Sequence, residues 1–475
     1  MLSSFLFVLL FVLELAQGLS TSGNRLLVVL EDEAEENKYS TFWDDLEGRG
    51  FDLTFESPKD EGLALFEHGD RAYDHLVLFP PKSKGLGPSL TPALLLKFLN
   101  AEGNILLALS SNSPTPSAIS SLLLELDIQL PPDRTSVAID HFNYDTLSSP
   151  EKHDVLLLPS PGSLRPDVRN FFGADSVGAG PIALPRAVGQ RLGNASPLLT
   201  PVLRAPETAY AYNPKDDAQT VEDSFATGQQ LSLVSTLQAR NSARFTILGS
   251  VESLADEWYD RKVRVSGTAG NKKEKDQTTA NRQFAKQLSA WTFKELGVVK
   301  VGAVEHFLND GFSHNDSASS LSELNPKIYR VKNDVTFSIE LSEYHYDHLA
   351  PFQLGASDEL QLEFTMLSPF HRLNLTPSRT TTNTTIYSTS FTLPDQHGIF
   401  AFRVNYKRPF LTPVDEKREV TVRHFAHDEW PRSWAISGAW VWIAGIWTTV
   451  GGWMVFVALW LWSEPVKGVS IKKVQ

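Results

Sequence analysis

The 475-residue sequence contains no cysteine. Disulfide bonds, thiolate metal sites, thiol nucleophiles and disulfide exchange are therefore excluded. Many secreted domains rely on disulfides, so this chain must hold its fold by burial alone. A chain of this length can do so, because large domains bury most of the surface that their unfolded chains expose.

The common catalytic motifs are also missing. There is no Gly-x-Gly-x-x-Gly after the first predicted strand, no phosphate-binding P-loop, no Gly-x-Ser-x-Gly and no His-Glu-x-x-His. The Asp-x-Asp pair, with which many glycosyltransferases hold a divalent metal on a diphosphate, is absent as well. The sequence therefore predicts no catalytic residue, no cofactor and no metal.

Positive charge is scarce. The formal net charge is -13 and the pI is near 5.4. The basic run at 272–275 is interrupted by Glu274 and lies in a polar segment. Nucleic-acid binding requires a basic patch, so we expect no nucleic-acid partner.

One long uncharged stretch stands near the C-terminus. No charged side chain occurs between Arg432 and Glu464. A spanning helix needs about 20 mostly apolar residues, so this stretch is long enough to cross a bilayer once. Tryptophans lie near both of its ends, where amphipathic rings favour the headgroup level. We predict a transmembrane helix over 435–462.

The tail that follows, 463–475, predicts the orientation of the chain. Its lysines, Lys467, Lys472 and Lys473, outnumber its acids and favour a cytosolic C-terminus. Lys472 and Lys473 also match the dilysine signal that returns type I membrane proteins to the endoplasmic reticulum. The alternative is a basic tail that only satisfies the orientation rule. We expect a single-pass type I protein of the endoplasmic reticulum membrane with its bulk in the lumen.

The N-terminus agrees with this topology. An apolar run over 5–13 is too short to span, and Ala16-Gln17-Gly18 is a small-x-small cleavage pattern, so 1–18 is predicted to be a signal peptide. The first residues lack Lys and Arg, so an uncleaved anchor is the alternative. The candidate N-glycosylation sites are Asn194, Asn315, Asn374 and Asn383.

The first part of the predicted lumenal region alternates buried strands with helices. Apolar runs bounded by turn residues predict strands, and helical spacing of apolar residues predicts helices between them. Strands that are apolar on both faces and separated by helices indicate a parallel sheet of the Rossmann or flavodoxin-like α/β type. The predicted strands are 26–30, 51–55, 75–79, 105–109, 154–158 and 245–249, and the predicted helices are 39–48, 91–102 and 279–296, the last ending at Gly297.

From about residue 298 the apolar period changes from 3.6 to 2. The segments 335–341, 360–366 and 400–404 alternate apolar and polar residues, as half-buried antiparallel strands do. Several such strands with turns between them indicate an immunoglobulin-like β-sandwich. The predicted organisation is a signal peptide at 1–18, a first α/β domain at 19–150, a second α/β portion at 151–298, a β-sandwich at 299–428, a transmembrane helix at 435–462 and a cytosolic tail at 463–475.

Three polar clusters could carry chemistry. Glu31-Asp32-Glu33 follows the first strand, where α/β folds place ligands, but such a run is more often a solvated loop. His345-Tyr346-Asp347-His348 has metal-ligand types without a clear third or fourth ligand. The segment 140–145 could supply a base and a carboxylate, although a hydrogen-bonded turn is the simpler reading.

Small residues line one face of the predicted span. Such a face lets another helix approach closely, whereas an anchor without partners could be leucine-rich. The residues of this helix-packing face are Ala444, Gly445, Thr448, Thr449 and Gly452.

Several short motifs, taken in their order along the chain, resemble a known family. They are 138–145 (Ala-Ile-Asp-His-Phe-Asn-Tyr-Asp), 237–244 (Leu-Gln-Ala-Arg-Asn-Ser-Ala-Arg), 291–295 with Gly297 and Val298, 360–364, and Leu393-Pro394-Asp395 with 398–400. With the opening strand, 50–55 and the single span, they are similar to the wheat-germ-agglutinin-binding-protein family, the forty-eight-kilodalton subunit of oligosaccharyltransferase. The resemblance covers nearly the whole lumenal region and the anchor.

The resemblance implies a non-catalytic subunit of the complex that transfers a preassembled glycan from dolichyl diphosphate to Asn-x-Ser/Thr of nascent chains. Its implied partners are the multi-pass catalytic subunit, a ribophorin II type subunit and a defender-against-death type subunit. A direct glycan-binding role would make His141, Asn143 and Tyr144 candidate contacts, because sugar sites combine aromatics with amides and carboxylates. The alternative function is a dilysine-bearing cargo or glycan-binding receptor of the early secretory pathway.

Overall fold

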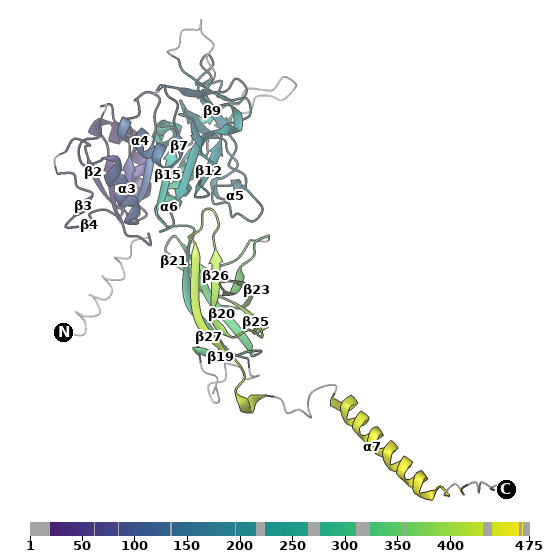
Figure 1. The fold of residues 1–475 in the computed structure, drawn as a ribbon. Coiled ribbons are helices and arrows are strands. Elements are labelled where there is room, and N and C mark those ends of the chain that lie inside the picture. Colours follow the sequence, from purple (N-terminus) through teal and green to yellow (C-terminus); the bar gives the residue numbers. More distant parts are fainter. Residues whose placement is uncertain are drawn as a thin grey trace, which may run out of the picture.

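The structure, a computed structural model, describes residues 20–60, 62–83, 85–133, 135–194, 196–214, 224–264, 276–309, 324–355, 357–430, 439–464 and 468. The predicted signal peptide at 1–18, the sequon at Asn315 and the dilysine pair Lys472 and Lys473 lie outside these residues. The described part is a mixed, sheet-rich fold followed by one apolar C-terminal helix (Figure 1).

A nine-stranded sheet forms the centre of the N-terminal part, which we call the α/β unit. Its strand order is β2-β1-β5-β6-β15-β14-β11-β7, and β12 pairs with β14 beside this path. The strands from β2 to β15 in this order are parallel, whereas β14, β11, β7 and β12 are antiparallel additions. The bounds are β1 Arg25–Val29, β2 Asp52–Glu56, β5 His75–Leu78, β6 Asn104–Ala108, β7 Ile128–Gln129, β11 Gln190–Leu192, β12 Leu199–Arg204, β14 Leu231–Gln238 and β15 Arg244–Leu248. The sheet is therefore mixed, although the sequence patterns predict a parallel one.

Helices cover both faces of this sheet. Alternate residues of β1 point to opposite sides, so Leu26 and Val28 join one apolar cluster and Leu27 and Val29 join the other. Helices α2 (Ser40–Glu47) and α6 (Asn281–Thr292) pack into the first cluster, and α3 (Pro92–Asn100) and α4 (Ser117–Glu125) pack into the second. Burial on both faces explains why these strands have no polar side.

The predicted helix over 279–296 ends earlier than Gly297. Helix α6 stops at Thr292, and Lys294 is the residue with the left-handed backbone, at φ 60°. Its amide donates to Trp291 O and the next amide donates to Ala290 O, which is a Schellman cap. Gly297 also has a positive φ of 68°, but it serves the contact with the next module described below.

The α/β unit also contains shorter strands and helices outside the nine-stranded sheet. The predicted strand at 154–158 forms β9, but it pairs with β10 in a separate two-stranded sheet. Strands β11, β12, β14 and β15 lie beyond residue 150 and still join the sheet of β1. The remaining elements are β3 (Phe66–Glu67), β4 (Asp70–Arg71), β8 (Val137–Ile139), β9 (Val155–Leu158), α5 (Ala174–Val177), β10 (Ile182–Pro185), β13 (Tyr210–Tyr212), β16 (Lys262–Val263), β17 (Gln277–Thr278) and the 3₁₀ helices η1 (Glu33–Tyr39), η2 (Gly228–Gln230), η3 (Val251–Leu254) and η4 (Asp256–Trp258).

Two five-stranded sheets pack face to face in the part that follows, which we call the β module. Their orders are β18-β20-β25-β24, with β21 beside β20, and β19-β27-β26-β22-β23. Phe337 of one sheet stacks on Phe402 of the other at 5.4 Å between ring centroids. The bounds are β18 Val298–Leu308, β19 Ile328–Arg330, β20 Asp334–His345, β21 His348–Pro351, β22 Gln361–Met366, β23 Ser368–Asn374, β24 Thr376–Thr380, β25 Thr385–Thr392, β26 Gly398–Tyr406, β27 Val414–Arg423 and the 3₁₀ helix η5 His427–Glu429.

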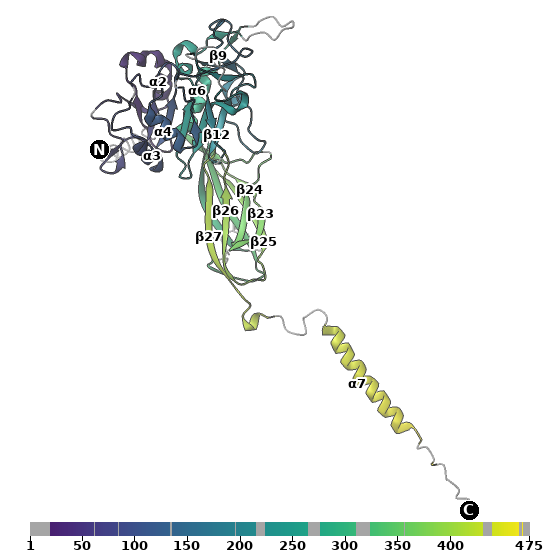
Figure 2. The same ribbon diagram turned by 45° about the horizontal axis from the view of Figure 1, so that its top comes forward.

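The α/β unit and the β module lie against each other in the ribbon view (Figure 2), and buried hydrogen bonds hold the chain on both sides of the passage between them. The guanidinium of Arg244 is completely buried and donates to the carbonyl oxygens of Trp291, Leu296 and Gly297. Val299 donates to Thr412 Oγ1 at 2.7 Å, and the same hydroxyl donates back to Val299 O at 3.0 Å. These bonds fix β18 where the chain passes from one part to the other.

Helix α7 (Ala439–Trp462) is the one described helix that is long and apolar enough to cross a membrane. Its 24 residues have a mean hydropathy of 1.6 in the most apolar window, and none of its side chains is buried in the described structure. The predicted span at 435–462 begins within the stretch 431–438, which lies outside the described residues.

Candidate functional site

A cavity opens at the edge of the sheet where its parallel strands end. Strands β1, β5, β6 and β15 are in register, with Val29 beside Leu78, Leu78 beside Leu107 and Ala108 beside Leu248. Their carboxyl ends therefore lie side by side. The cavity of about 890 Å³ is lined by residues that follow these ends, including Glu35, Pro80, Asn112 and Glu252. Ligands of open α/β sheets bind at this edge.

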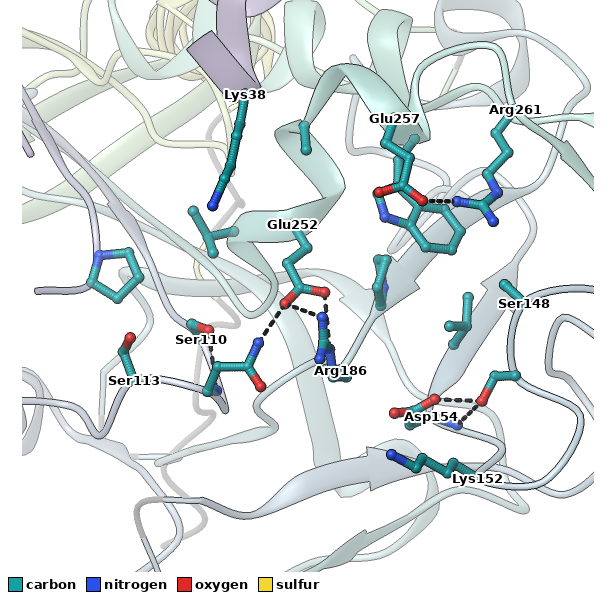
Figure 3. Close-up of a pocket in the computed structure, with 18 of the residues that line it drawn as sticks. Lys38, Ser110, Ser113, Ser148, Lys152, Asp154, Arg186, Glu252, Glu257 and Arg261 are labelled. Carbon is teal, nitrogen blue, oxygen red and sulfur yellow. Dashed lines mark hydrogen bonds and ion pairs between the residues drawn. The ribbon is translucent and has the colours of Figure 1, made fainter. Parts of the chain in front are cut away.

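The opposite wall comes from loops outside the sheet. The segment 147–155 supplies Ser148, Ser149 and Asp154, and the end of β10 supplies Arg186. Helix η4 and the turn after it add Trp258 and Arg261. In Figure 3, Arg186 and Glu252 lie between Lys38 on one side and Asp154 on the other.

An ion pair organises the middle of the cavity. Arg186 Nε donates to Glu252 Oε2 at 3.0 Å, and Arg186 Nη2 lies 2.7 Å from Glu252 Oε1. Asn112 Nδ2 donates to the same Oε1 at 2.8 Å. This fork geometry holds both side chains in one orientation. The cavity therefore presents a fixed set of donors and acceptors from three elements.

Other charges in the wall are also engaged. Glu257 accepts from Arg261, whose guanidinium lies 4.4 Å from the ring centroid of Trp258. Asp154 accepts from Ser149. Burial raises the pKa of Tyr39 far above its usual value, and the nearby Glu35 and Glu252 raise it further, so its hydroxyl stays protonated. Such a lining suits hydrogen bonding to a neutral, polar ligand.

The three candidate glycan contacts lie outside the lining of the cavity, and His141 and Tyr144 contact His153 of the 147–155 loop. His141 bonds through its two ring nitrogens to His153 and, at 3.0 Å, to Tyr210 Oη. Tyr144 stacks on His153 with 3.9 Å between ring centroids. Asn143 Nδ2 donates to Asp140, which is completely buried. His141 and Tyr144 thus belong to one aromatic cluster, whereas Asn143 stabilises a turn through its bond to Asp140. None of the three lines the cavity.

The acidic run at 31–33 and the histidine-containing run at 345–348 both have side chains that are hydrogen-bonded to neighbouring residues. Glu31 accepts from Lys59 at 2.7 Å, and this bond lowers the pKa of its carboxyl. Asp32 accepts from Lys82 at 2.9 Å. His348 lies 2.6 Å from Asp347 in the turn between β20 and β21. Among the described residues, no group of three or more His, Asp or Glu side chains could hold a metal ion.

The candidate glycosylation sites that the structure describes are exposed. Asn194 lies in a loop, Asn374 ends β23, and Asn383 lies in the turn between β24 and β25. Each side chain is therefore accessible from solvent.

The helix-packing face lies on α7. Thr448 Oγ1 donates to the carbonyl oxygens of Ala444 and Gly445, and Thr449 Oγ1 donates to Gly445 O. The hydroxyls are thereby satisfied within the helix. No described atom comes within 4 Å of a Cβ built on Gly445 or Gly452, so a neighbouring helix could approach this face.

The cavity residues Asn112, Arg186, Glu252 and Trp258 are missed by sequence reasoning. They come from separate loops without periodicity, and their spacing has no motif. One signal was present, because Asn112 follows the predicted strand at 105–109 and therefore lies at the carboxyl edge.

Two family models match nearly the whole chain. The OST48 N-terminal domain matches residues 17–295, and the OST48 middle domain matches residues 313–464. The dolichyl-diphosphooligosaccharide–protein glycosyltransferase subunit wbp1 of Schizosaccharomyces pombe is 33% identical over 464 residues, which are 97% of this chain and 98% of the relative. The 48 kDa subunit from Danio rerio is 31% identical over 95% of each chain. The 48 kDa subunit from Arabidopsis thaliana is 30% identical over 93% of each chain.

Proposed function

Because the chain belongs to the OST48 family, we infer that it is a subunit of a dolichyl-diphosphooligosaccharide–protein glycosyltransferase, the oligosaccharyltransferase complex. It serves the transfer of a preassembled glycan to Asn-x-Ser/Thr in N-linked glycosylation. The observation that carries this function is similarity over nearly the full length of named subunits, both domains included. The cargo-receptor alternative has no support from these relatives.

We propose that the subunit is accessory and not catalytic. Three of the five carboxylates that line the cavity support this role, because Glu252, Glu257 and Asp154 are each held by a donor from the protein itself. A general base must be free to reach a substrate proton. The α/β unit and the β module then act as a lumenal platform beside the catalytic subunit.

The proposed topology is a single-pass type I protein of the endoplasmic reticulum membrane, with a cleaved signal at 1–18 and a cytosolic dilysine tail. The apolar helix α7 supports the span. The uncovered small-residue face of α7 supports docking to helices of other subunits. The partners we propose are the multi-pass catalytic subunit, the ribophorin II type subunit and the defender-against-death type subunit.

The proposed fold types follow from strand order. The parallel strands run β2-β1-β5-β6-β15, which is the 2-1-3-4-5 order of flavodoxin-like sheets. Two sheets that share a core and whose strands pair antiparallel, except for β19 beside β27, support the immunoglobulin-like assignment for 299–428. We propose that the α/β unit consists of a first domain at 19–150 and a second portion at 151–298.

A second role, direct glycan binding, is favoured by the cavity. Its polar lining, its position at the carboxyl edge and its preset Arg186–Glu252 pair suit a neutral ligand with many hydroxyls. His141 and Tyr144 form an additional aromatic cluster with His153 of the 147–155 loop, outside the cavity lining.

The subunit function is tested by isolating the chain from membranes solubilised in a mild detergent. An affinity tag is placed after residue 18, so that Lys472 and Lys473 remain at the free C-terminus. The eluate is assayed for glycan transfer from a dolichyl-diphosphate-linked oligosaccharide to an Asn-x-Thr peptide. Co-elution of a multi-pass transferase with activity supports the function, whereas an inactive chain that elutes alone contradicts it.

A further inference from the structure

The strongly exposed large apolar side chains of the β module are all at one of its ends. In the described residues between 298 and 429 there are five such side chains, and Trp430 follows them with 51% of its surface exposed. Leu367 is the most exposed, at 109%. We call this set the basal apolar cluster, and its members are Leu324, Ile328, Leu367, Phe370, Ile399 and Trp430.

The strand register brings these side chains together. Ile328 of β19 and Ile399 of β26 both pair with Thr421, from opposite sides of β27. Paired residues point to the same face of a sheet, so the two isoleucines form one exposed row. Leu367 lies in the turn between β22 and β23, and the preceding Met366 packs against Gly398, so this turn lies beside the same row.

The chain leaves the β module at this end and is held there. Arg423, the last residue of β27, donates to both oxygens of Glu429 at 2.7 and 2.8 Å. The guanidinium of Arg330 lies 5.2 Å from the ring centroid of Phe425, and that ring lies 5.2 Å from Trp430. These contacts hold Trp430 where β27 ends, and Figure 1 shows β19 and β27 together at this end of the β module.

The sequence keeps this end close to the membrane. Only residues 431–438 separate Trp430 from the first residue of α7, Ala439. Consecutive Cα atoms are 3.8 Å apart and an extended chain advances at most about 3.6 Å per residue, so the two cannot be more than about 32 Å apart. The interfacial layer of a bilayer lies within that reach.

We propose that the basal apolar cluster rests in the headgroup layer of the membrane that α7 crosses, so that lipid is its occupant. A convex set of side chains from separate turns and strand ends suits a lipid surface, which has no fixed shape to match. Tryptophan favours this layer, and the apolar side chains gain from leaving water. The β module then touches the membrane at a second place besides its anchor.

The absence of native cysteine permits a direct test with the full chain, since a single introduced cysteine is the one thiol. Leu367→Cys places an environment-sensitive fluorophore in the cluster. Thr382→Cys is the matched control, because Thr382 is exposed in the turn between β24 and β25, which lies toward the opposite end of the module. Both variants are reconstituted in phosphatidylcholine vesicles that contain headgroup-spin-labelled lipid, and both are also examined in membranes that contain the assembled complex.

The fluorophore at position 367 is expected to be quenched by the spin-labelled lipid and to be about fivefold less accessible to iodide than the fluorophore at position 382. Equal iodide access at the two positions overturns the proposal. Protection from both iodide and lipid in the complex also overturns it, because a protein then covers the cluster. Ile399→Cys is a second reporter in the same cluster, and the two cluster positions must agree.

Discussion

The indole Nε1 of Trp291 donates a hydrogen bond of 2.9 Å to the carbonyl oxygen of Phe410, and so ties the last helix of the α/β unit to the β module. The two rings also meet edge to face, with 5.8 Å between their centroids. Trp291 is fully buried and its other face carries the guanidinium of Arg244, 4.6 Å from the ring centroid. One side chain thus joins both parts.

Gly297→Ala should destabilise the folded chain. Gly297 has φ 68°, and a Cβ there would lie 2.4 Å from Phe410 O. The left-handed backbone and the clash together predict a loss of about 2 kcal/mol or more in the free energy of unfolding. Gly162→Ala is the control, since no atom lies within 4 Å of its Cβ position. Urea unfolding of the detergent-solubilised chain measures both, and equal midpoints would contradict the prediction.

Arg244→Lys should lower the free energy of unfolding although the positive charge is kept. The planar guanidinium serves three carbonyl oxygens at once, whereas an ammonium cannot reach all of them from one position. We expect a loss of about 3 kcal/mol, because buried acceptors and a buried cation are left poorly paired. Exposed Arg379→Lys should be neutral in the same unfolding experiment.

His75 should make the protein acid-sensitive. Burial lowers the pKa of this histidine from 6.5 to about 4. Between these values the unfolded chain binds a proton that the folded chain does not, so stability falls as the pH falls from 6.5 to 4. The full shift corresponds to about 3 kcal/mol. His75→Asn should reduce this slope, to which His306, whose pKa burial also lowers to about 4, contributes as well. Exposed His68→Asn should leave the slope unchanged, and an unchanged slope in His75→Asn would exclude His75 as a cause.

Glu252→Gln should weaken glycan binding in the cavity. The change removes the charge that holds Arg186 and Asn112 in place. We expect about a tenfold loss of affinity for the free oligosaccharide, measured by calorimetry with the full chain in detergent. Exposed Glu207→Gln is the control. If the unaltered chain shows no saturable binding, the cavity is not a glycan site.

Gly445→Leu combined with Gly452→Leu should release the subunit from its complex. Bulk on the small-residue face prevents close helix approach. Val450→Phe adds bulk on the opposite side of the helix, about 170° from the centre of this face, and should be tolerated. Co-purification with a multi-pass transferase measures the effect, and unchanged co-purification of the double variant would exclude this face as the docking surface.

The strands that sequence could predict are those with an unbroken buried apolar run, such as β1, β5 and β6, although β5 and β6 each begin with a buried polar residue. Strand β14 could not be predicted in this way, because it is buried on both faces and carries a polar residue on each, Ser235 on one and Thr236 on the other. Their hydroxyls are satisfied by Gln190 and by Thr200 O, contacts that depend on chain segments about 40 residues away. A pattern of apolar residues cannot report burial that hydrogen bonds make possible.

The candidate site, like the strands, could be predicted from the sequence only in part. Its place at the carboxyl edge follows from a parallel sheet, and Glu31 and Asp32 were noticed there for that reason. Its working residues were not, because Arg186 and Glu252 are far apart in sequence and meet only when β10 and η3 come together. The motif at 138–145 drew attention to His141 and Tyr144. Both side chains contact His153, and neither lines the cavity.

Strand β20 gives the β module a length that has a consequence for the whole assembly. Its 12 residues, at about 3.3 Å each, span about 40 Å. Beyond its upper end the Tyr346 amide donates to Glu295 O of the α/β unit, and at the opposite end Arg423 and Glu429 secure the exit of the chain. The β module thus separates the α/β unit from the exit of the chain toward α7 by about 40 Å, and in the topology proposed above this length sets how far from the membrane the cavity stands.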